Sequence, residues 1–304
     1  MSMPTIEQLN RDFAIQDQLN VTAGEGGFPI IEVANGKATA RISVYAGQVL
    51  SFRPADEPED LLFLSEHAYY QEGKAIKGGV PICWPWFGPD PEGKGRPAHG
   101  FVRNRPWRLF ATETTPEGDT KVVLQMLADD ETQSLWPHAF DLLLEITVGS
   151  ELTLALITRN TGGNSFSVTQ ALHTYFKVGD ISKVEVLGLE NVRYLDKVDN
   201  GEEKIQAGAV GISGEVDRVY SGVTSDLSIV DEALGRRILI RSISSSTAVV
   251  WNPWVAIAKQ MADLADDDYQ RFICVETANA AEEIVEIPSG GEGRLIARYS
   301  IERD

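Results

Sequence analysis

The chain has little cysteine and no long apolar run. It contains two cysteines, Cys83 and Cys274, so a disulfide framework is not indicated and a reducing compartment is expected. No apolar stretch approaches the ~18 residues that a membrane-spanning helix needs. The N-terminus also lacks the charged and apolar regions of a signal peptide. These absences predict a cytoplasmic protein that does not contact a membrane.

Positive charge is scarce as well. There are 27 Lys and Arg residues against 45 Asp and Glu residues, which gives a net charge of −18 at pH 7. A surface of this sign argues against general binding of nucleic acids or acidic membranes. Residues 74–108 depart from the average, because basic residues outnumber acidic residues there (Lys74, Lys77, Lys94, Arg96, Arg103, Arg105 and Arg108 against Asp90 and Glu92). Any site for an anionic ligand must be a local positive patch, and this segment is the best candidate.

Helical periodicity is rare, and short alternating apolar runs dominate. They are broken by Gly, Asn, Asp and Pro, which is typical of antiparallel strands. We predict strands within 37–54, 120–128, 164–178, 181–198, 236–253, 271–278 and 290–301, and a hairpin within 140–163 that turns at Gly149-Ser150. We also predict a short helix over 6–16 and a helical turn within 262–272. The fold class is therefore all-β: a large antiparallel β-sandwich with few short helices. No linker or repeat interrupts the chain, so we expect one domain over 1–304 with an N-terminal extension of about residues 1–20.

The segment 81–106 breaks this pattern. It holds six of the fourteen prolines and four glycines, so it cannot form a regular strand. We expect a long surface loop that covers one face of the sandwich, and long loops of this kind are often functional. Trp84 and Trp86 are candidates for the wall of a sugar pocket, whereas Trp107 is better interpreted as a core anchor.

Three titratable residues lie in apolar or aromatic sequence. His99 is in the proline-rich segment, His173 is inside the predicted strand "ALHTYF", and Glu276 follows the apolar run "FICV". Each is ambiguous alone, since a core histidine or a strand-end glutamate is equally ordinary. Together they suit general acid–base catalysis, because burial raises a carboxyl pKa and a nearby carboxylate keeps a histidine protonated longer. We find no motif for a covalent nucleophile, a metal site or a phosphate-binding loop.

A series of motifs resembles a known family. "KGGVPICWPWFGP", "HGFVRNRPW", "ALHTYF", "DRVY", "VVWNPW" and "CVET" follow one another over about residues 42–299. In this order they resemble the aldose 1-epimerase superfamily, and within it the D-hexose-6-phosphate mutarotases, or glucose-6-phosphate 1-epimerases. The resemblance implies a galactose mutarotase-like supersandwich and an isomerase that interconverts the α and β anomers of a hexose 6-phosphate, with glucose 6-phosphate as the expected substrate.

The resemblance also implies roles for single residues. The family's catalytic histidine and glutamate match His173 and Glu276. Its other sugar-contacting histidine matches His99, and a sugar-binding aspartate matches Asp217 of "DRVY". It implies neither a metal nor an organic cofactor, and we expect a monomer whose partner is a small sugar phosphate.

The phosphate-contacting positions match Arg103 of "HGFVR" and Lys77 before "GGVP". The second is a departure, because this branch usually has arginine there. Lysine supplies a point charge where arginine would supply a bidentate fork.

Two other interpretations stay open. A non-catalytic carbohydrate-binding or regulatory protein on the same fold would keep the basic, aromatic segment but would not need His173 and Glu276 together. A metal-dependent sugar isomerase would use His99, His173 and Glu276 as ligands. The sequence leaves the preferred hexose and its pathway undetermined.

Overall fold

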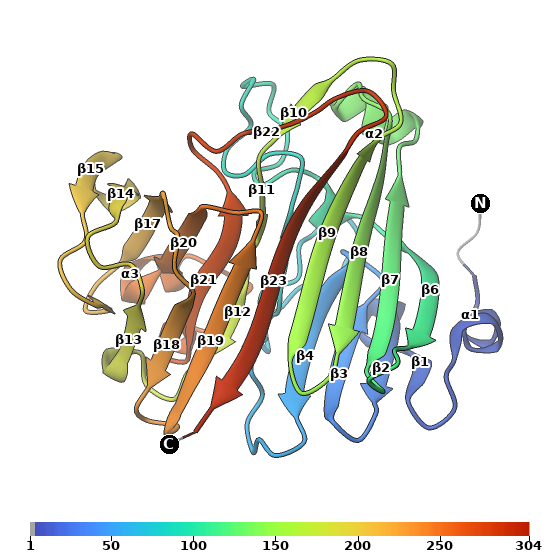
Figure 1. Cartoon of the computed structure of the whole chain (residues 1–304), viewed down its shortest axis with the longest axis horizontal. Coiled ribbons are helices and arrows are strands. Elements are labelled where there is room, and N and C mark those ends of the chain that lie inside the picture. The colour runs from blue at the N-terminus through green and yellow to red at the C-terminus, as the bar shows by residue number, and fades with distance from the viewer. Residues whose placement is uncertain (1–3, 304) are drawn as a thin grey trace.

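The computed structural model describes residues 4–303 and is built almost entirely from antiparallel strands. A nine-stranded sheet forms one long layer, and two smaller sheets lie behind its two halves (Figure 1). This arrangement confirms the predicted antiparallel β-sandwich. Within residues 4–303 no helix is long and apolar enough to cross a membrane.

The strands are ordered as follows. The four-stranded sheet has the order β1 (Leu19–Ala23), β2 (Pro29–Ala34), β3 (Ala38–Ser43) and β4 (Gln48–Pro54). The nine-stranded sheet has the order β16 (Val210–Gly211), β13 (Val184–Leu187), β18 (Leu227–Asp231), β19 (Arg236–Ile243), β23 (Glu292–Glu302), β9 (Leu152–Asn160), β8 (Phe140–Val148), β7 (Thr120–Leu127) and β6 (Arg108–Thr114). The eight-stranded sheet has the order β15 (Glu202–Ile205), β14 (Arg193–Asp196), β17 (Val216–Ser221), β20 (Thr247–Asn252), β21 (Phe272–Asn279), β11 (Gln170–Leu172) and β5 (Ile82–Cys83), with β12 (Tyr175–Lys177) also paired to β21. A small ribbon pairs β10 (Phe166–Val168) with β22 (Val285–Ile287).

The helical elements are short, as the sequence predicts. The α-helices are α1 (Ile6–Phe13), α2 (Asp130–Leu135) and α3 (Trp254–Ala258), and 3-10 turns cover Glu25–Gly27, Val102–Asn104, Ile181–Lys183, Lys197–Asp199 and Asp268–Gln270. The last turn confirms the prediction for 262–272. The predicted helix over 6–16 is confirmed as α1, which a Thr5–Gln8 capping box begins.

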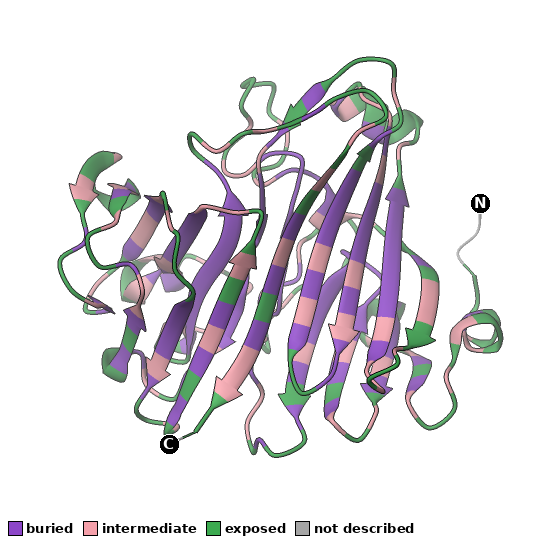
Figure 2. Ribbon diagram, viewed as in Figure 1, coloured by how far each residue is buried: buried purple, intermediate pink, exposed green. Residues whose placement is uncertain are grey.

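The two faces of the eight-stranded sheet have different partners. Alternate side chains such as Val250 and Val275 point inward and join the main hydrophobic core shared with the other sheets. The intervening side chains, such as Val249 and Glu276, point to the outer face, because successive residues of a strand alternate. β21 is nevertheless buried along its whole length (Figure 2). The outer face must therefore be covered by other segments, and it is there that the pocket lies.

The segment 81–106 differs in part from the prediction of a surface loop. Ile82 and Cys83 form β5, which pairs with β11 at the edge of the eight-stranded sheet. Trp84 is fully buried, and its indole N–H donates to Thr158. A segment rich in proline can still place short stretches in a sheet and in the core, while its middle, 88–99, is irregular and largely exposed.

The segment 164–178 is not one strand but three. β10, β11 and β12 are separated by short breaks, and His173 lies in the break between β11 and β12. There the backbone N–H of His173 donates to the carbonyl of Pro81. The prediction that His173 lies inside a strand is therefore wrong, because this backbone group bonds to the neighbouring segment.

Candidate active site

His173 and Glu276 meet because of strand register. On β21, Thr277 pairs with Leu172 of β11, and Cys274 pairs with Tyr175 of β12. His173 and Glu276 fall between these two pairs at the same level of the sheet. Directly opposite residues on antiparallel strands have neighbouring side chains. Nε2 of His173 lies 3.5 Å from Oε1 of Glu276.

An aliphatic row continues from Glu276 across the sheet. Val249 of β20 pairs with Glu276, and Val219 of β17 pairs with Val249. Leu195 of β14 pairs with Val219 and completes the row. The Glu276 carboxylate therefore lies at the end of a row of aliphatic side chains. These side chains contribute to its burial in apolar surroundings.

A second, parallel row lies two residues further along each strand. It runs from Asp217 through Trp251 and Cys274 to Tyr175. Residues two apart share a face of the sheet. The second row therefore sets an acidic group and two aromatic rings beside the first row, on the same side.

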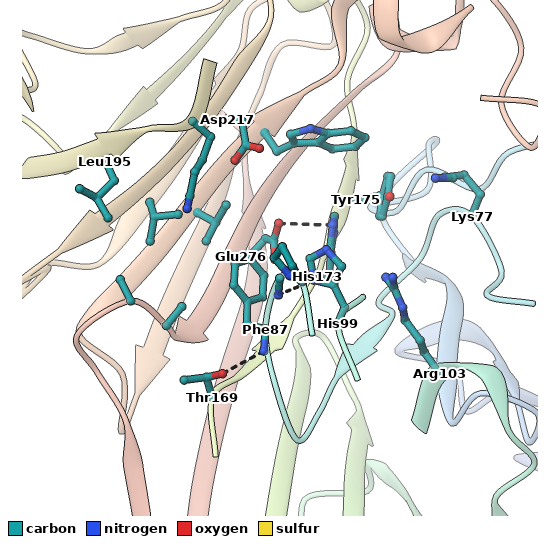
Figure 3. A pocket seen from close by; sticks show the side chains of 18 of the residues that line it. Lys77, Phe87, His99, Arg103, Thr169, His173, Tyr175, Leu195, Asp217 and Glu276 are labelled. Carbon is teal, nitrogen blue, oxygen red and sulfur yellow. Dashed lines mark hydrogen bonds and ion pairs between the residues drawn. The ribbon is translucent and has the colours of Figure 1, made fainter. Parts of the chain in front are cut away.

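These rows form the floor of a pocket of about 640 Å³. All six residues that the sequence singles out for catalysis or binding line it: Lys77, His99, Arg103, His173, Asp217 and Glu276. In Figure 3, Lys77 and Arg103 lie on one side of the His173–Glu276 pair, and Asp217 and Leu195 lie on the other. The fold thus brings together residues from distant parts of the chain, and each points toward one space.

The His173–Glu276 pair is almost completely buried. Burial raises the pKa of Glu276 well above its usual value, and the negative charge of Asp217 adds to this effect. Burial also lowers the pKa of His173, so the expectation that a nearby carboxylate keeps this histidine protonated longer is wrong. Oε2 of Glu276 and Nδ1 of His173 are buried and make no hydrogen bond to any residue within 4–303. Buried polar atoms without partners are rare and are found where a ligand binds or chemistry occurs.

Aromatic rings fix the orientation of His173. The Tyr175 ring stacks on the imidazole with centroids 5.0 Å apart, and Trp251 meets it edge-on at 5.9 Å. These contacts restrict ring rotation without a hydrogen bond to Nδ1. His173 is therefore held in place with Nε2 toward Glu276, and its Nδ1 makes no hydrogen bond within residues 4–303.

His99 is held in one tautomer. The backbone N–H of Gly88 donates to Nδ1 of His99 over 3.3 Å, and Sγ of Cys83 lies 3.5 Å from the same nitrogen. A nitrogen that accepts a hydrogen bond carries no proton, so the proton of the neutral ring is on Nε2. Burial, Arg103 and Lys77 lower the pKa of His99 to about 3. His99 is thus a neutral donor.

The turn that carries His99 depends on backbone geometry. His99 has a φ of +64° and Gly100 one of +75°. A β-carbon on Gly100 would overlap the carbonyl of Trp84, which pairs with Gly100 in a parallel bridge. Only glycine permits this close approach, and the approach directs His99 into the pocket.

Two cations form one end of the pocket. Arg103 donates to the carbonyl of Ala98, and it forms no ion pair with a carboxylate among the residues that the structure describes. Its Nε is buried and makes no hydrogen bond within 4–303. Lys77 lies 3.5 Å from Asp263, so its charge is partly offset. Arg103 is the less neutralised of the two and the better candidate for an anionic group.

Most of the other basic residues of 74–108 serve structural roles. Arg96 pairs with Asp90 and stacks on the Trp86 ring, and Arg105 pairs with Glu131. These ion pairs partly neutralise Arg96 and Arg105. Of the seven Lys and Arg residues in this segment, Lys77 and Arg103 are the two that line the pocket.

The aromatic wall of the pocket differs from the prediction. Trp84 and Trp86 are core residues and do not line the pocket, whereas Trp251 and Phe87 do. Trp107 is buried, as expected. Trp84 and Trp86 point inward because the chain there enters the sandwich. The motif "VVWNPW" was the available signal for Trp251.

Lys197 was missed by the sequence analysis. It follows β14 directly, is exposed, and lines the pocket near Asp217. Burial raises the pKa of Asp217, and the positive charge of Lys197 opposes that shift. No motif marks Lys197, since its position depends on the pairing of β14 with β17. Within residues 4–303, no three His, Cys, Asp or Glu side chains are grouped to hold a metal ion.

Comparison with known proteins shows the family to which this chain belongs. Residues 29–294 match the model of the family described as aldose 1-epimerase. A protein of Escherichia coli (strain K12) named "Putative glucose-6-phosphate 1-epimerase" is 38% identical over 284 residues, which cover 92% of this chain and 91% of that protein. A protein of Cenchrus ciliaris with the same name is 39% identical, over 84% of this chain and 79% of its own.

Comparison with solved structures also identifies proteins that share this fold. The crystal structure of a "putative mutarotase" from Salmonella typhimurium has a TM-score of 0.89 at 32% identity and covers 96% of both chains. A galactose mutarotase-like protein from Clostridium acetobutylicum has a TM-score of 0.74 at 15% identity, covering 97% of this chain and 100% of its own, which shows the shared fold. The chain belongs to the aldose 1-epimerase family.

Proposed function

We propose that this protein interconverts the α and β anomers of a hexose 6-phosphate, with glucose 6-phosphate as substrate, as a glucose-6-phosphate 1-epimerase. The observation that carries the proposal is the buried His173–Glu276 pair, 3.5 Å apart, in a pocket with Lys77 and Arg103 to one side. The names of the relatives in Escherichia coli and Cenchrus ciliaris point to the same substrate. An acidic protein needs such a positive patch to hold a phosphate.

Anomer exchange requires a base and an acid on neighbouring oxygens. Glu276 takes the proton from the C1 hydroxyl while protonated His173 gives a proton to the ring oxygen, and the C1–O5 bond breaks. Rotation about C1–C2 exposes the other face of the aldehyde. The same two groups return the protons as the ring closes, so atoms and protons balance over the cycle.

The shifted pKa values suit these roles. A carboxylate with a raised pKa is a stronger base, and an imidazolium with a lowered pKa is a stronger acid. The pair therefore has a large driving force for both proton transfers once its proton lies on His173, although burial favours the form in which Glu276 carries that proton. Each positioned acid or base typically contributes about 10²–10⁴-fold.

The remaining residues orient the sugar. His99 donates from Nε2 to a ring hydroxyl, and Asp217 accepts from another. Arg103 and Lys77 hold the phosphate, which does not react. Trp251 and Phe87 offer aromatic faces to the C–H groups of the ring.

An anomer-resolved NMR exchange experiment tests this function. Glucose 6-phosphate labelled with ¹³C at C1 should show exchange cross-peaks between its anomers that grow with enzyme concentration, and glucose should exchange far more slowly. The Glu276→Gln variant controls for catalysis by buffer. Exchange at the buffer rate with wild-type protein that binds the sugar phosphate would favour the non-catalytic interpretation. Loss of exchange on addition of a chelator would favour the metal-dependent one.

A further inference from the structure

The pocket extends beyond the His173–Glu276 pair on the side away from Lys77 and Arg103. In Figure 3, Lys77 and Arg103 lie on one side of the pair, and Asp217 and Leu195 on the other. The floor of this second side is the aliphatic row of Val249, Val219 and Leu195. Acid–base chemistry and phosphate binding require no contact between the substrate and this aliphatic row.

The order of atoms in a hexopyranose 6-phosphate predicts which part of the substrate lies there. C6 is attached to C5, and C2 is attached to C1, while the ring oxygen joins C5 to C1. We take the phosphate to lie at Arg103 and the C1–O5 bond to lie at His173 and Glu276. The substituents of C1 and C2 then project away from Arg103 and Lys77. The C2 substituent therefore faces the aliphatic row.

A hydroxyl group alone fits this row poorly. Aliphatic side chains offer no hydrogen bond, and burying a hydroxyl against them without a partner is unfavourable. An apolar group would instead gain from contact with Val249 and Val219. The row thus favours a substituent that ends in a methyl group.

Two polar groups flank the row and define the rest of the substituent. Asp217 is a half-buried carboxylate, and Lys197 is an ammonium group near it that lines the same pocket. The positive charge of Lys197 acts on this carboxylate and opposes the rise of its pKa. Together they supply an acceptor for an N–H group and a donor for a carbonyl. A buried amide needs both partners.

We propose that the pocket is built to accept a 2-acetamido-2-deoxyhexose 6-phosphate as a substrate, with its methyl group on Val249 and Val219 and its amide between Asp217 and Lys197. The proposal rests on the proposed function, because it uses the same acid–base pair and phosphate site. Neighbouring strands are about 4.8 Å apart, and an acetamido group spans about 4 Å. The methyl group therefore reaches Val249 and Val219 but not Leu195.

The first test compares two substrates with wild-type enzyme. We expect kcat/KM for anomer exchange of 2-acetamido-2-deoxyglucose 6-phosphate to equal or exceed that of glucose 6-phosphate. A ratio below one overturns the inference while exchange of glucose 6-phosphate upholds the proposed function. If neither sugar exchanges faster than in buffer, the proposed function fails and the inference fails with it.

A second test uses variants in the row. Val249→Thr and Val219→Thr keep the side-chain shape but replace a methyl with a hydroxyl group, and each should lower the ratio of kcat/KM for the acetamido sugar over glucose 6-phosphate about fourfold. The ratio cancels changes that affect both substrates, such as a shifted Glu276 pKa. Leu195→Asn lies in the same row but beyond reach of the methyl group, and it should leave the ratio within about twofold. Equal ratios in all three variants and wild type would overturn the inference.

A binding measurement gives a readout that does not depend on turnover. When protein methyl resonances are saturated, the acetyl methyl of the bound sugar should receive more saturation than its ring protons, and excess glucose 6-phosphate should abolish the effect. Binding with an acetyl methyl less saturated than the ring would contradict the proposed contact.

Discussion

Glu276 stands opposite His173 at one level of the sheet, and Nε2 of the histidine lies 3.5 Å from Oε1 of the glutamate. Neither Oε2 nor Nδ1 makes a hydrogen bond within residues 4–303. A pair so buried and so incompletely bonded is unfavourable for folding. Its proposed use in proton transfer leads to the following expectations.

Removal of either member of the pair should abolish most of the activity. Glu276→Gln lacks a base and His173→Asn lacks an acid, so each should lower kcat at least about 10²-fold. The double variant should lose much less than the product of the two losses, because the residues act together. Exchange NMR on folded variants measures all three, and near wild-type kcat in either single variant would refute the assignment.

The folded protein should gain stability when Glu276 is neutralised. Its folded pKa is raised by burial, so the folded chain binds more protons than the unfolded chain above about pH 4.3. Stability due to this group is therefore lost as pH rises through the raised pKa. Glu276→Gln should increase the free energy of unfolding by about 0.5–2 kcal/mol at alkaline pH, and by less in acid. Urea denaturation at both pH values measures this, and an equal gain at both would contradict it.

The pH dependence of exchange should be bell-shaped. Burial raises the pKa of Glu276 and lowers that of His173, so the pair holds one proton near neutral pH. A second proton in acid removes the base, and loss of the shared proton in alkali removes the acid. The two apparent pKa values belong to the pair. An unphosphorylated hexose is the proper substrate, since phosphate itself ionises near pH 6; a profile flat from about pH 5 to 9 would count against the pair.

Arg103 should contribute to binding rather than to chemistry. The phosphate does not react, so its contacts are similar in ground and transition states. Arg103→Ala should raise KM for the sugar phosphate about tenfold or more and change kcat less. Lys77→Arg should be tolerated, because a guanidinium restores bidentate geometry. The decisive quantity is kcat/KM for phosphorylated over free sugar, and if Arg103→Ala does not lower it, the phosphate lies elsewhere.

His99 should remain neutral, with its proton on Nε2, throughout the working pH range. Its pKa of about 3 and the hydrogen bond from Gly88 both favour this form. Long-range ¹H–¹⁵N spectra of labelled protein distinguish the tautomers. A protonated ring near pH 6, or a proton on Nδ1, would exclude the proposed donor role.

Local sequence patterns predicted the architecture well. Alternating apolar residues with Gly149-Ser150 between them specify the β8–β9 hairpin, because side-chain period and turn residues are local properties. The three titratable residues that the sequence analysis singled out, His173, Glu276 and His99, line one pocket. The local patterns missed two helices, α2 and α3, and several strands: β1, β2, β5, β6, β15, β16, β17, β18 and β22.

The sequence alone therefore determined the all-β class, the longer strands with clear alternation and the chemical types available for a site. Only the tertiary structure decided which groups meet. Period-two alternation shows that Val249 and Trp251 share a face, but not whether core or pocket covers that face. Register set His173 against Glu276, and the packing of distant segments buried both and fixed the Gly88–His99 hydrogen bond. Their shifted pKa values follow from that burial, which depends on contacts between residues far apart in the chain.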